Sequence, residues 1–277
     1  YDPSTGARAS ARCCTSDFTL AEFRQLQGKM DDFNPRASTA AEYLRGTTDW
    51  RTGIHARRGS LLTHAESIEL FQQMGVKMTP ELKQPNVTMP WQGSYTQRNF
   101  AQQLIDEYKQ ANVSPEDVWP QSFHLADVEY WIENEPRFGR QAIYLDARMH
   151  ADPPLKPSLA DFERIKGLGI EIVAPPMFTL LELNAHGDIV PSGYAKLAKA
   201  AGLGIIAWTF ERSDLRKGAL DGNGNATFYY QSIASAIEKE SDMYRALDVL
   251  ARDVEVQGVF SDWPATVTYY ANCMGLQ

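Results

Sequence analysis

The sequence has no run of 18 apolar residues and no signal-peptide pattern at its start, so we expect no transmembrane segment in these 277 residues. It also lacks a positive charge balance, because 27 Lys and Arg stand against 35 Asp and Glu, for a net charge of −8. This deficit argues against a nucleic-acid partner or an anionic membrane surface. Any phosphate-bearing ligand must therefore be met by local cations or by a metal.

Cysteine is scarce, with three residues in the chain. Cys13 and Cys14 are adjacent, so a disulfide between them would be strained. We predict that at least one of them is bonded, either to Cys273 or to a cysteine outside this chain, which implies an oxidising compartment. The chain starts without Met in a loop-like stretch, which suggests a processed piece. Three glycosylation sequons are compatible with secretion, at Asn86, Asn112 and Asn225.

A hydrophobic content of 43% can build a sizeable core, in one large α/β domain or two smaller ones. Residues 1–60 are rich in Gly, Pro, Ser, Thr and charge, and we interpret them as a long irregular loop with one short helix near residues 19–29. Residues 61–277 alternate between strand and helix patterns. We expect strands at 78–83, 118–123, 141–146, 170–174, 204–210 and 256–261, and helices at 63–75, from 96, and at 125–133, 158–167, 192–201, 230–252 and 265–273.

Six β/α units in alternation predict parallel strands with helices packed outside them. An open doubly wound sheet would also satisfy the pattern. However, no Gly-rich phosphate fingerprint follows any strand, and polar residues collect at the C-terminal ends of the strands, as barrel-mouth residues do. A complete (β/α)8 TIM-type barrel has eight units. The sequence therefore predicts such a barrel lacking its first two β/α units in this chain.

The run from Met78 to Lys83 contains the first candidate site residues. If this run is a strand, Glu81 and Lys83 emerge on one face and Leu82 on the other. A carboxylate that can hold a divalent cation would then stand beside an ammonium that can meet a phosphate, which is the pairing that phosphoester chemistry needs. The alternative is an exposed Glu/Lys pair at a strand end.

Four segments carry a family resemblance: residues 78–83 (MTPELK), 121–123 (QSF), 208–210 (WTF) and 261–264 (SDWP). In this order and spacing they resemble the later-strand motifs of the glycerophosphodiester phosphodiesterase family, over roughly residues 60–277. Residues 1–32 further resemble a loop insertion in a secreted or periplasmic branch of that family.

The resemblance implies a TIM barrel that hydrolyses glycerophosphodiesters to glycerol 3-phosphate and an alcohol with one divalent cation, Ca²⁺ or Mg²⁺. Glu81 matches a metal carboxylate, Lys83 a lysine that faces the phosphate, and Trp208 the aromatic residue at the end of the seventh strand. The family's catalytic histidines precede these motifs, so we expect them upstream of Tyr1, on an N-terminal segment of the same precursor that would be this chain's partner. The chain would be secreted or periplasmic.

Other residues fit the pattern less well. Glu211 stands where the family commonly has Asn, and Asp262 could assist the site, although we favour it as the N-cap of the last helix. His64 and His124 are interpreted as helix-start residues. Three further histidines lie in loops, and the sequence assigns them no function: His55, His150 and His186. Two interpretations stay open for three aromatic residues, which either wall an apolar side of the pocket or pack in the core or in loops: Trp91, Tyr95 and Trp119.

Two alternatives stay open. A lyase-type phospholipase D, which forms cyclic phosphates, would use the same barrel and metal. A non-catalytic binding or structural relative would have lost the catalytic first units.

Overall fold

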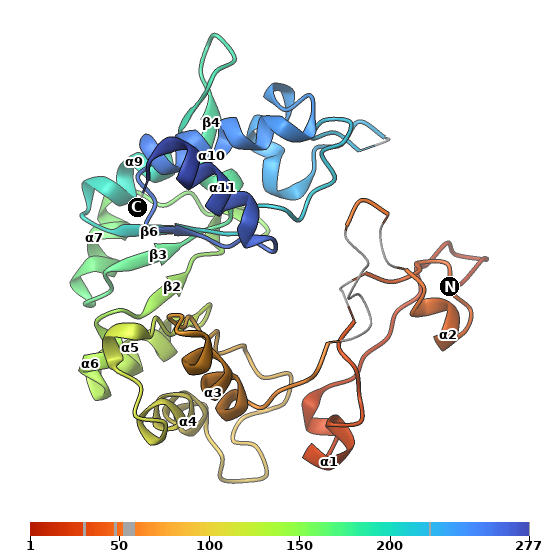
Figure 1. Cartoon of the computed structure of the whole chain (residues 1–277), viewed down its shortest axis with the longest axis vertical. Coiled ribbons are helices and arrows are strands. Elements are labelled where there is room, and N and C mark those ends of the chain that lie inside the picture. Colours follow the sequence, from red (N-terminus) through yellow and green to blue (C-terminus); the bar gives the residue numbers. More distant parts are fainter. Residues whose placement is uncertain (30–31, 47–48, 52–58, 222, 277) are drawn as a thin grey trace.

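The computed structural model describes residues 1–29, 32–46, 49–51, 59–221 and 223–276. It is an α/β structure in which strands β2, β3 and β6 run side by side and helices lie around them (Figure 1). No helix in the described ranges is long and apolar enough to cross a membrane.

Five short parallel strands form the main sheet, in the order β1-β2-β3-β6-β7. Their bounds are β1 (Gln121–Ser122), β2 (Ile143–Leu145), β3 (Ile172–Ala174), β6 (Gly204–Ala207) and β7 (Gly258–Val259). Isolated parallel bridges join Met78 to Val118 and Glu81 to Gln121, so residues 78–82 run beside β1 as a sixth strand. All six expected strand positions are confirmed, although each regular strand is shorter than the sequence pattern.

The two outer strands each have one strand neighbour among the described residues. Residues 78–82 pair with β1, and β7 pairs with β6. A closed barrel pairs every strand on both sides. The sheet is therefore open at both edges within the described part of the chain, and the eight-stranded barrel stays a prediction.

Helices cover one face of this sheet. The longer ones are α3 (His64–Met74), α4 (Gln97–Gln110), α5 (Leu125–Asn134), α7 (Leu159–Gly167), α9 (Gly193–Ala200), α10 (Met243–Arg252) and α11 (Pro264–Met274), with the short α6 (Pro136–Gly139) after α5. Local rules explain their bounds, because Thr63 caps α3 in a reciprocal capping box with Glu66 and Gly75 ends it with a left-handed φ of 65°. Thr96, Ser158 and Ser192 cap α4, α7 and α9 in the same way, by accepting backbone N–H groups.

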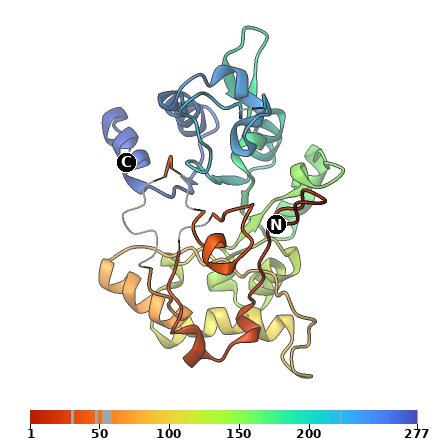
Figure 2. The ribbon, with the colours of Figure 1, turned by 90° about the vertical axis from the view of Figure 1, so that its right-hand side faces the viewer.

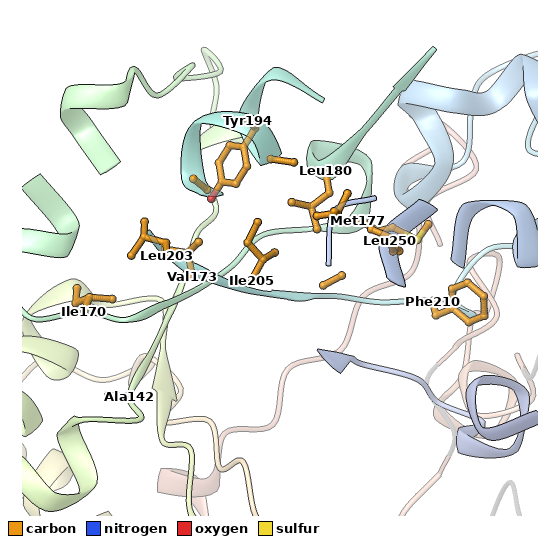
Figure 3. Close-up of a cluster of buried hydrophobic side chains, with 14 of the residues drawn as sticks. Ala142, Ile170, Val173, Met177, Leu180, Tyr194, Leu203, Ile205, Phe210 and Leu250 are labelled. Atoms are coloured by element: carbon orange, nitrogen blue, oxygen red, sulfur yellow. The ribbon is translucent and has the colours of Figure 1, made fainter. Parts of the chain in front are cut away.

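The larger core lies between the sheet and these helices. Val173 of β3 and Ile205 of β6 point from the strands toward Leu180 and the ring of Tyr194 in α9 (Figure 3). Each fully buried side chain of this kind stabilises the fold by about 1.5–3 kcal/mol relative to an exposed one.

The opposite, inner face of the sheet is also apolar. Ile143, Leu145, Ile172 and Ala174 are buried there, and Trp119, Ile206 and Trp208 pack against them. Strands that are apolar on both faces are typical of parallel sheets covered on both sides. The inner face is therefore the one that a barrel would enclose.

Three sequence expectations are corrected. The continuous helix at 230–252 is wrong, because the chain forms η4 (Phe228–Ala236), η5 (Glu240–Asp242) and then α10, with Ile233 at a non-helical φ of −128° and Ile237 extended. The helix at 19–29 is reduced to α1 (Leu20–Phe23). An antiparallel hairpin that the sequence analysis missed joins β4 (Leu181–Leu183) to β5 (Ile189–Pro191) after the short α8 (Met177–Leu180).

The N-terminal segment, with η1 (Thr15–Asp17), α1 and α2 (Ala40–Tyr43), lies on the side away from α6 and α7 and is nearest the viewer in Figure 2. Its terminal ammonium donates to the carbonyl of Ala37 at 2.7 Å, and Ala9 N–H donates to Pro35 at 2.9 Å. At its far end Arg51 donates to Asp262 at 2.7 Å. The segment is thus tied both to itself and to the loop that follows β7.

Candidate functional site

Glu81 and Lys83 emerge together from the outermost strand segment. Lys83 Nζ lies 3.6 Å from Glu81 Oε2, and the side chains are 80% and 27% exposed, respectively. Leu82 between them is buried in the helix-side core. This confirms the predicted alternation. An ion pair this exposed adds little to stability, so its place at the C-terminal end of a strand is its more informative property.

Gln121 stands beside Glu81 on the neighbouring strand. The two residues are bridge partners, so their side chains leave the sheet on the same face. Gln121 is 4% exposed and donates from Nε2 to Thr79 at 3.2 Å, but its Oε1 has no hydrogen-bond partner among the described residues. Burying an amide oxygen without a hydrogen bond costs free energy. Here that oxygen belongs to the bridge partner of Glu81, so two oxygen groups lie together without a donor for Oε1 from the described part of the chain.

This pair of oxygens fits a hard cation. Carboxylate and amide oxygens are the ligands that Ca²⁺ and Mg²⁺ take, although each ion takes about six or more oxygens in total. The described residues contain no group of three or more His, Cys, Asp and Glu that could hold a metal. Glu81 and Gln121 therefore fit as part of a cation site, with the remaining ligands supplied by other groups.

Trp208 follows β6 at the same end of the sheet. Its indole N–H donates to the carbonyl of Ala174 at 2.7 Å, which fixes the ring against β3. Phe123 and His150 meet it edge to face, with ring centroids 5.7 Å and 6.0 Å away. Trp208 was predicted near the site from its motif, whereas His150 had no local signal because its partner is 58 residues further on.

Asp146, at the end of β2, was expected among the polar residues of the barrel mouth, but it forms a structural network on the helix side of the sheet. It is 1% exposed, and its carboxylate accepts from Arg148 at 2.8 Å and 2.6 Å and from the hydroxyl of Tyr194 at 2.6 Å. Burial, reinforced by the Asp146 charge, raises the pKa of Tyr194 well above its ordinary value, so the hydroxyl stays a donor. This network ties β2 to α9 on the helix side.

The loops after β6 and β7 are joined by a second polar network. Glu211 is 8% exposed and accepts from the Ser261 hydroxyl at 2.7 Å and from Asp262 N–H at 2.9 Å. Asp262 accepts from Arg51 at 2.7 Å and from Arg212 at 3.0 Å. Asp262 is therefore not the N-cap of α11, which is Trp263 without a side-chain cap. The prediction of an Asp262 N-cap was wrong because the carboxylate binds Arg51 and Arg212 and not the first N–H groups of α11.

The other described histidines lie at helix starts or in a turn. His64 Nδ1 lies 2.8 Å from Glu107 Oε2 at the start of α3, and His124 Nδ1 lies 3.3 Å from Asp127 at the start of α5, so both are helix-start residues as expected. His186 is in the β4–β5 turn, and His55 lies outside the described residues.

A pocket of about 560 Å³ adjoins Lys83. Trp91 and Tyr95 line it, as do Cys13 and Cys14 of the N-terminal segment. Trp91 and Tyr95 thus line a pocket, and a role for them in binding substrate stays a prediction. Trp119 packs on the inner face of the sheet under Lys77, 5.1 Å from its ring.

The cysteines are not bonded within the chain. Cys13 and Cys273 are exposed, Cys14 is half-buried, and all three are free thiols. A bond from Cys13 or Cys14 to Cys273 is therefore not present in this structure. A bond to a cysteine outside the chain stays a prediction.

Comparison with known proteins identifies one relative by sequence. No family model matches the chain. A protein of Arthroderma benhamiae named "Extracellular protein" is 46% identical over 249 residues, which cover 89% of this chain and 100% of the relative. The chain belongs to the family of this extracellular protein.

Comparison of structures shows the fold. A protein of Silicibacter pomeroyi DSS-3, assigned as a glycerophosphoryl diester phosphodiesterase, superposes with a TM-score of 0.59 at 17% identity, over 97% of this chain and 73% of that chain. A glycerophosphodiester phosphodiesterase of Parabacteroides distasonis ATCC 8503 is more distant, with a TM-score of 0.48 at 14% identity over 86% and 76% of the two chains. The first likeness shows that the α/β arrangement described above is one already known from solved proteins.

Proposed function

We propose that this chain forms most of a metal-dependent enzyme that hydrolyses glycerophosphodiesters to glycerol 3-phosphate and an alcohol. The observation that carries the proposal is the grouping of Glu81, Lys83 and the unpartnered Gln121 oxygen at the C-terminal ends of two paired parallel strands. The fold shared with the Silicibacter pomeroyi protein supports it. In parallel α/β folds this end of the strands is where active sites lie.

Each residue has a distinct role in the proposal. Glu81 and the Oε1 of Gln121 would hold Ca²⁺ or Mg²⁺, which when bound withdraws charge from a phosphodiester. Lys83, 80% exposed, can turn from Glu81 to a phosphate oxygen and compensate the charge that develops there. Trp208 would contact the substrate beyond the phosphate.

Proton transfer is assigned to histidines on an N-terminal segment of the same precursor. His64 and His124 are already engaged by Glu107 and Asp127 on the helix side, which leaves them poorly placed for a phosphate at Lys83. The proposal takes the general acid and base from outside the chain because the family resemblance places its catalytic histidines before the motifs found here.

The same segment would complete the sheet. A pocket of about 720 Å³ opens along the inner face, with Met78 and Thr79 of the first strand on one side and Gly258 and Val259 of β7 on the other. Unpaired strand edges attract further strands. Two parallel strands inserted here would pair both edges and close an eight-stranded barrel. Secretion of the protein is supported by its likeness to the extracellular protein of Arthroderma benhamiae.

The test uses glycerophosphocholine as substrate and protein expressed from its complete gene, with products followed by ³¹P NMR. Glycerol 3-phosphate that appears with added Ca²⁺ or Mg²⁺ and stops with chelator is the expected result. A cyclic glycerophosphate product would instead assign the lyase-type reaction. Absence of any cleavage would refute the proposed enzymatic activity and favour a non-catalytic binding protein.

Residues 1–277 expressed alone test the second part of the proposal. Without the added strands and histidines, their turnover should be at most about 1% of that of the complete protein, because loss of a catalytic acid or base costs about 10²–10⁴-fold. Equal turnover by the two would contradict the need for an added segment.

A further inference from the structure

Five aromatic rings line the C-terminal ends of the strands, and we call them the aromatic wall: Phe123, His150, Trp208, Phe228 and Tyr229. Phe123 follows β1, His150 closes η3 (Arg148–His150) after β2, Trp208 follows β6, and the last two begin η4. The ends of β1, β2 and β6 and the start of η4 thus contribute rings to one surface, and of the five only Tyr229 also packs against the helix-side core around Trp131.

The rings touch one another in a continuous chain. Trp208 meets Phe123, His150 and Tyr229 edge to face at centroid distances of 5.7 Å, 6.0 Å and 6.2 Å. Phe228 joins His150 and Tyr229 at 5.7 Å and 5.0 Å. The wall is therefore one packed unit, and each ring is held in place by at least one other.

Part of the wall is open to solvent. Phe123 and Phe228 are each 43% exposed, and Trp208 and Tyr229 are half-buried. The two phenylalanines are linked through Trp208 and His150. Exposed apolar rings cost free energy in water, and linked apolar surface of this kind typically marks a binding site.

The wall adjoins the proposed phosphate position. Glu81 and Gln121 are bridge partners in parallel strands, and Lys83 and Phe123 each follow two residues later, so both side chains emerge where these neighbouring strand segments end. A phosphate at Lys83 would therefore have one ester substituent next to Phe123.

The geometry favours an alkyl chain as that substituent. A site for a quaternary ammonium presents open ring faces, usually with a carboxylate nearby. Here the edge-to-face contacts cover ring faces with neighbouring rings, none of the five wall residues is an acid, and the indole N–H of Trp208 is already bonded to Ala174. The surface that remains offers apolar contact.

We propose that the aromatic wall binds the alkyl chain of a phosphodiester whose phosphate lies at Lys83, so that lysophospholipid-like diesters are the preferred substrate class. This rests on the proposed function for the position of the phosphate. The binding of the chain itself is a property of the wall alone.

The experiment compares monomeric decylphosphocholine with glycerophosphocholine, which share the phosphocholine group and differ in the second ester substituent. Binding is measured by calorimetry and by tryptophan fluorescence, on protein from its complete gene, with chelator present to prevent turnover. Decylphosphocholine should bind at least about tenfold more tightly, since several methylenes leave water.

Phe228→Ala should weaken decylphosphocholine binding by about fivefold and leave glycerophosphocholine unchanged, because the lost ring contacts the chain only. Phe123→Ala should act in the same direction. The matched control is Tyr269→Ala, which removes a ring 63% exposed on α11, away from the wall, and should change neither affinity.

Equal binding of the two ligands, or an affinity ratio that neither phenylalanine variant alters, would overturn the inference. So would binding to phosphatidylcholine vesicles without binding to the monomers, since the wall would then meet a membrane surface. These outcomes are separate from the proposed function. If glycerophosphocholine is cleaved while the alkyl chain adds no affinity, the wall proposal alone fails; if the chain binds while no diester is cleaved, the function alone fails.

Discussion

Replacing Tyr194 by phenylalanine removes one oxygen from the network that ties β2 to α9. The hydroxyl donates to Asp146 at 2.6 Å, and both residues are buried. A hydrogen bond to a buried charged group contributes about 1.5–3 kcal/mol. The ring remains, so its edge-to-face contact with Phe162 at 4.9 Å is kept and no large cavity forms.

The loss of unfolding free energy expected for Tyr194→Phe falls in the lower half of that range. Asp146 keeps its bidentate contact with Arg148 at 2.8 Å and 2.6 Å, so its charge is not left without partners. We expect Tyr194→Phe to lower the free energy of unfolding by about 2 kcal/mol. Asp146→Asn should cost more, about 3 kcal/mol, because it leaves Arg148 without its counter-charge.

Urea denaturation followed by circular dichroism measures both values. Tyr269→Phe, the same change at a tyrosine 63% exposed, is the control and should stay within about 0.5 kcal/mol of the wild type. A loss below about 0.5 kcal/mol for Tyr194→Phe would refute the reasoning, since the hydrogen bond would then contribute no more than a surface group.

Two further predictions concern alkaline pH and backbone packing. Burial, with a smaller contribution from the Glu211 charge, raises the pKa of Tyr230; the unfolded chain therefore releases this proton above pH about 10 while the folded chain keeps it, and stability falls as pH rises. Between pH 9 and 11, urea titrations should show a loss of stability that is smaller by about 1.4 kcal/mol in total in Tyr230→Phe, and an equal loss in the two proteins would contradict this. Gly139→Ala places a Cβ 2.4 Å from the carbonyl of Trp131 and should cost about 1–3 kcal/mol in the same assay. Gly193→Ala, whose Cβ meets nothing within 4 Å, is its control, and equal costs for the two would count against the packing argument.

Local signals in the sequence were enough to place most elements. The Thr63 and Ser158 caps and the Gly75 stop act within a few residues, so the helices they bound are read from short windows. The alternation around Leu82 likewise placed Glu81 and Lys83 on one face. These features depend on backbone geometry, which the neighbouring residues determine.

The misses came from contacts between distant residues. Asp262, with a proline two residues further on, has the pattern of a helix start, but Arg51, 211 residues away, takes its carboxylate. The helix expected at 230–252 has suitable periodicity, yet Ile233 and Ile237 are buried in non-helical conformations. The free oxygen of Gln121 could not be foreseen either, because it depends on which atoms the folded chain leaves beside it.

Glu81 provides the most direct test of the account. Glu81→Gln keeps the shape of the side chain and removes its charge, and Glu163→Gln makes the same change at an exposed position of α7. In protein from its complete gene, Glu81→Gln should lower kcat/KM for glycerophosphocholine by about 10²-fold or more while leaving the unfolding free energy unchanged, and Glu163→Gln should match the wild type. Turnover of Glu81→Gln within about threefold of the wild type would contradict the assignment of Glu81 to the cation and, with it, the proposed site.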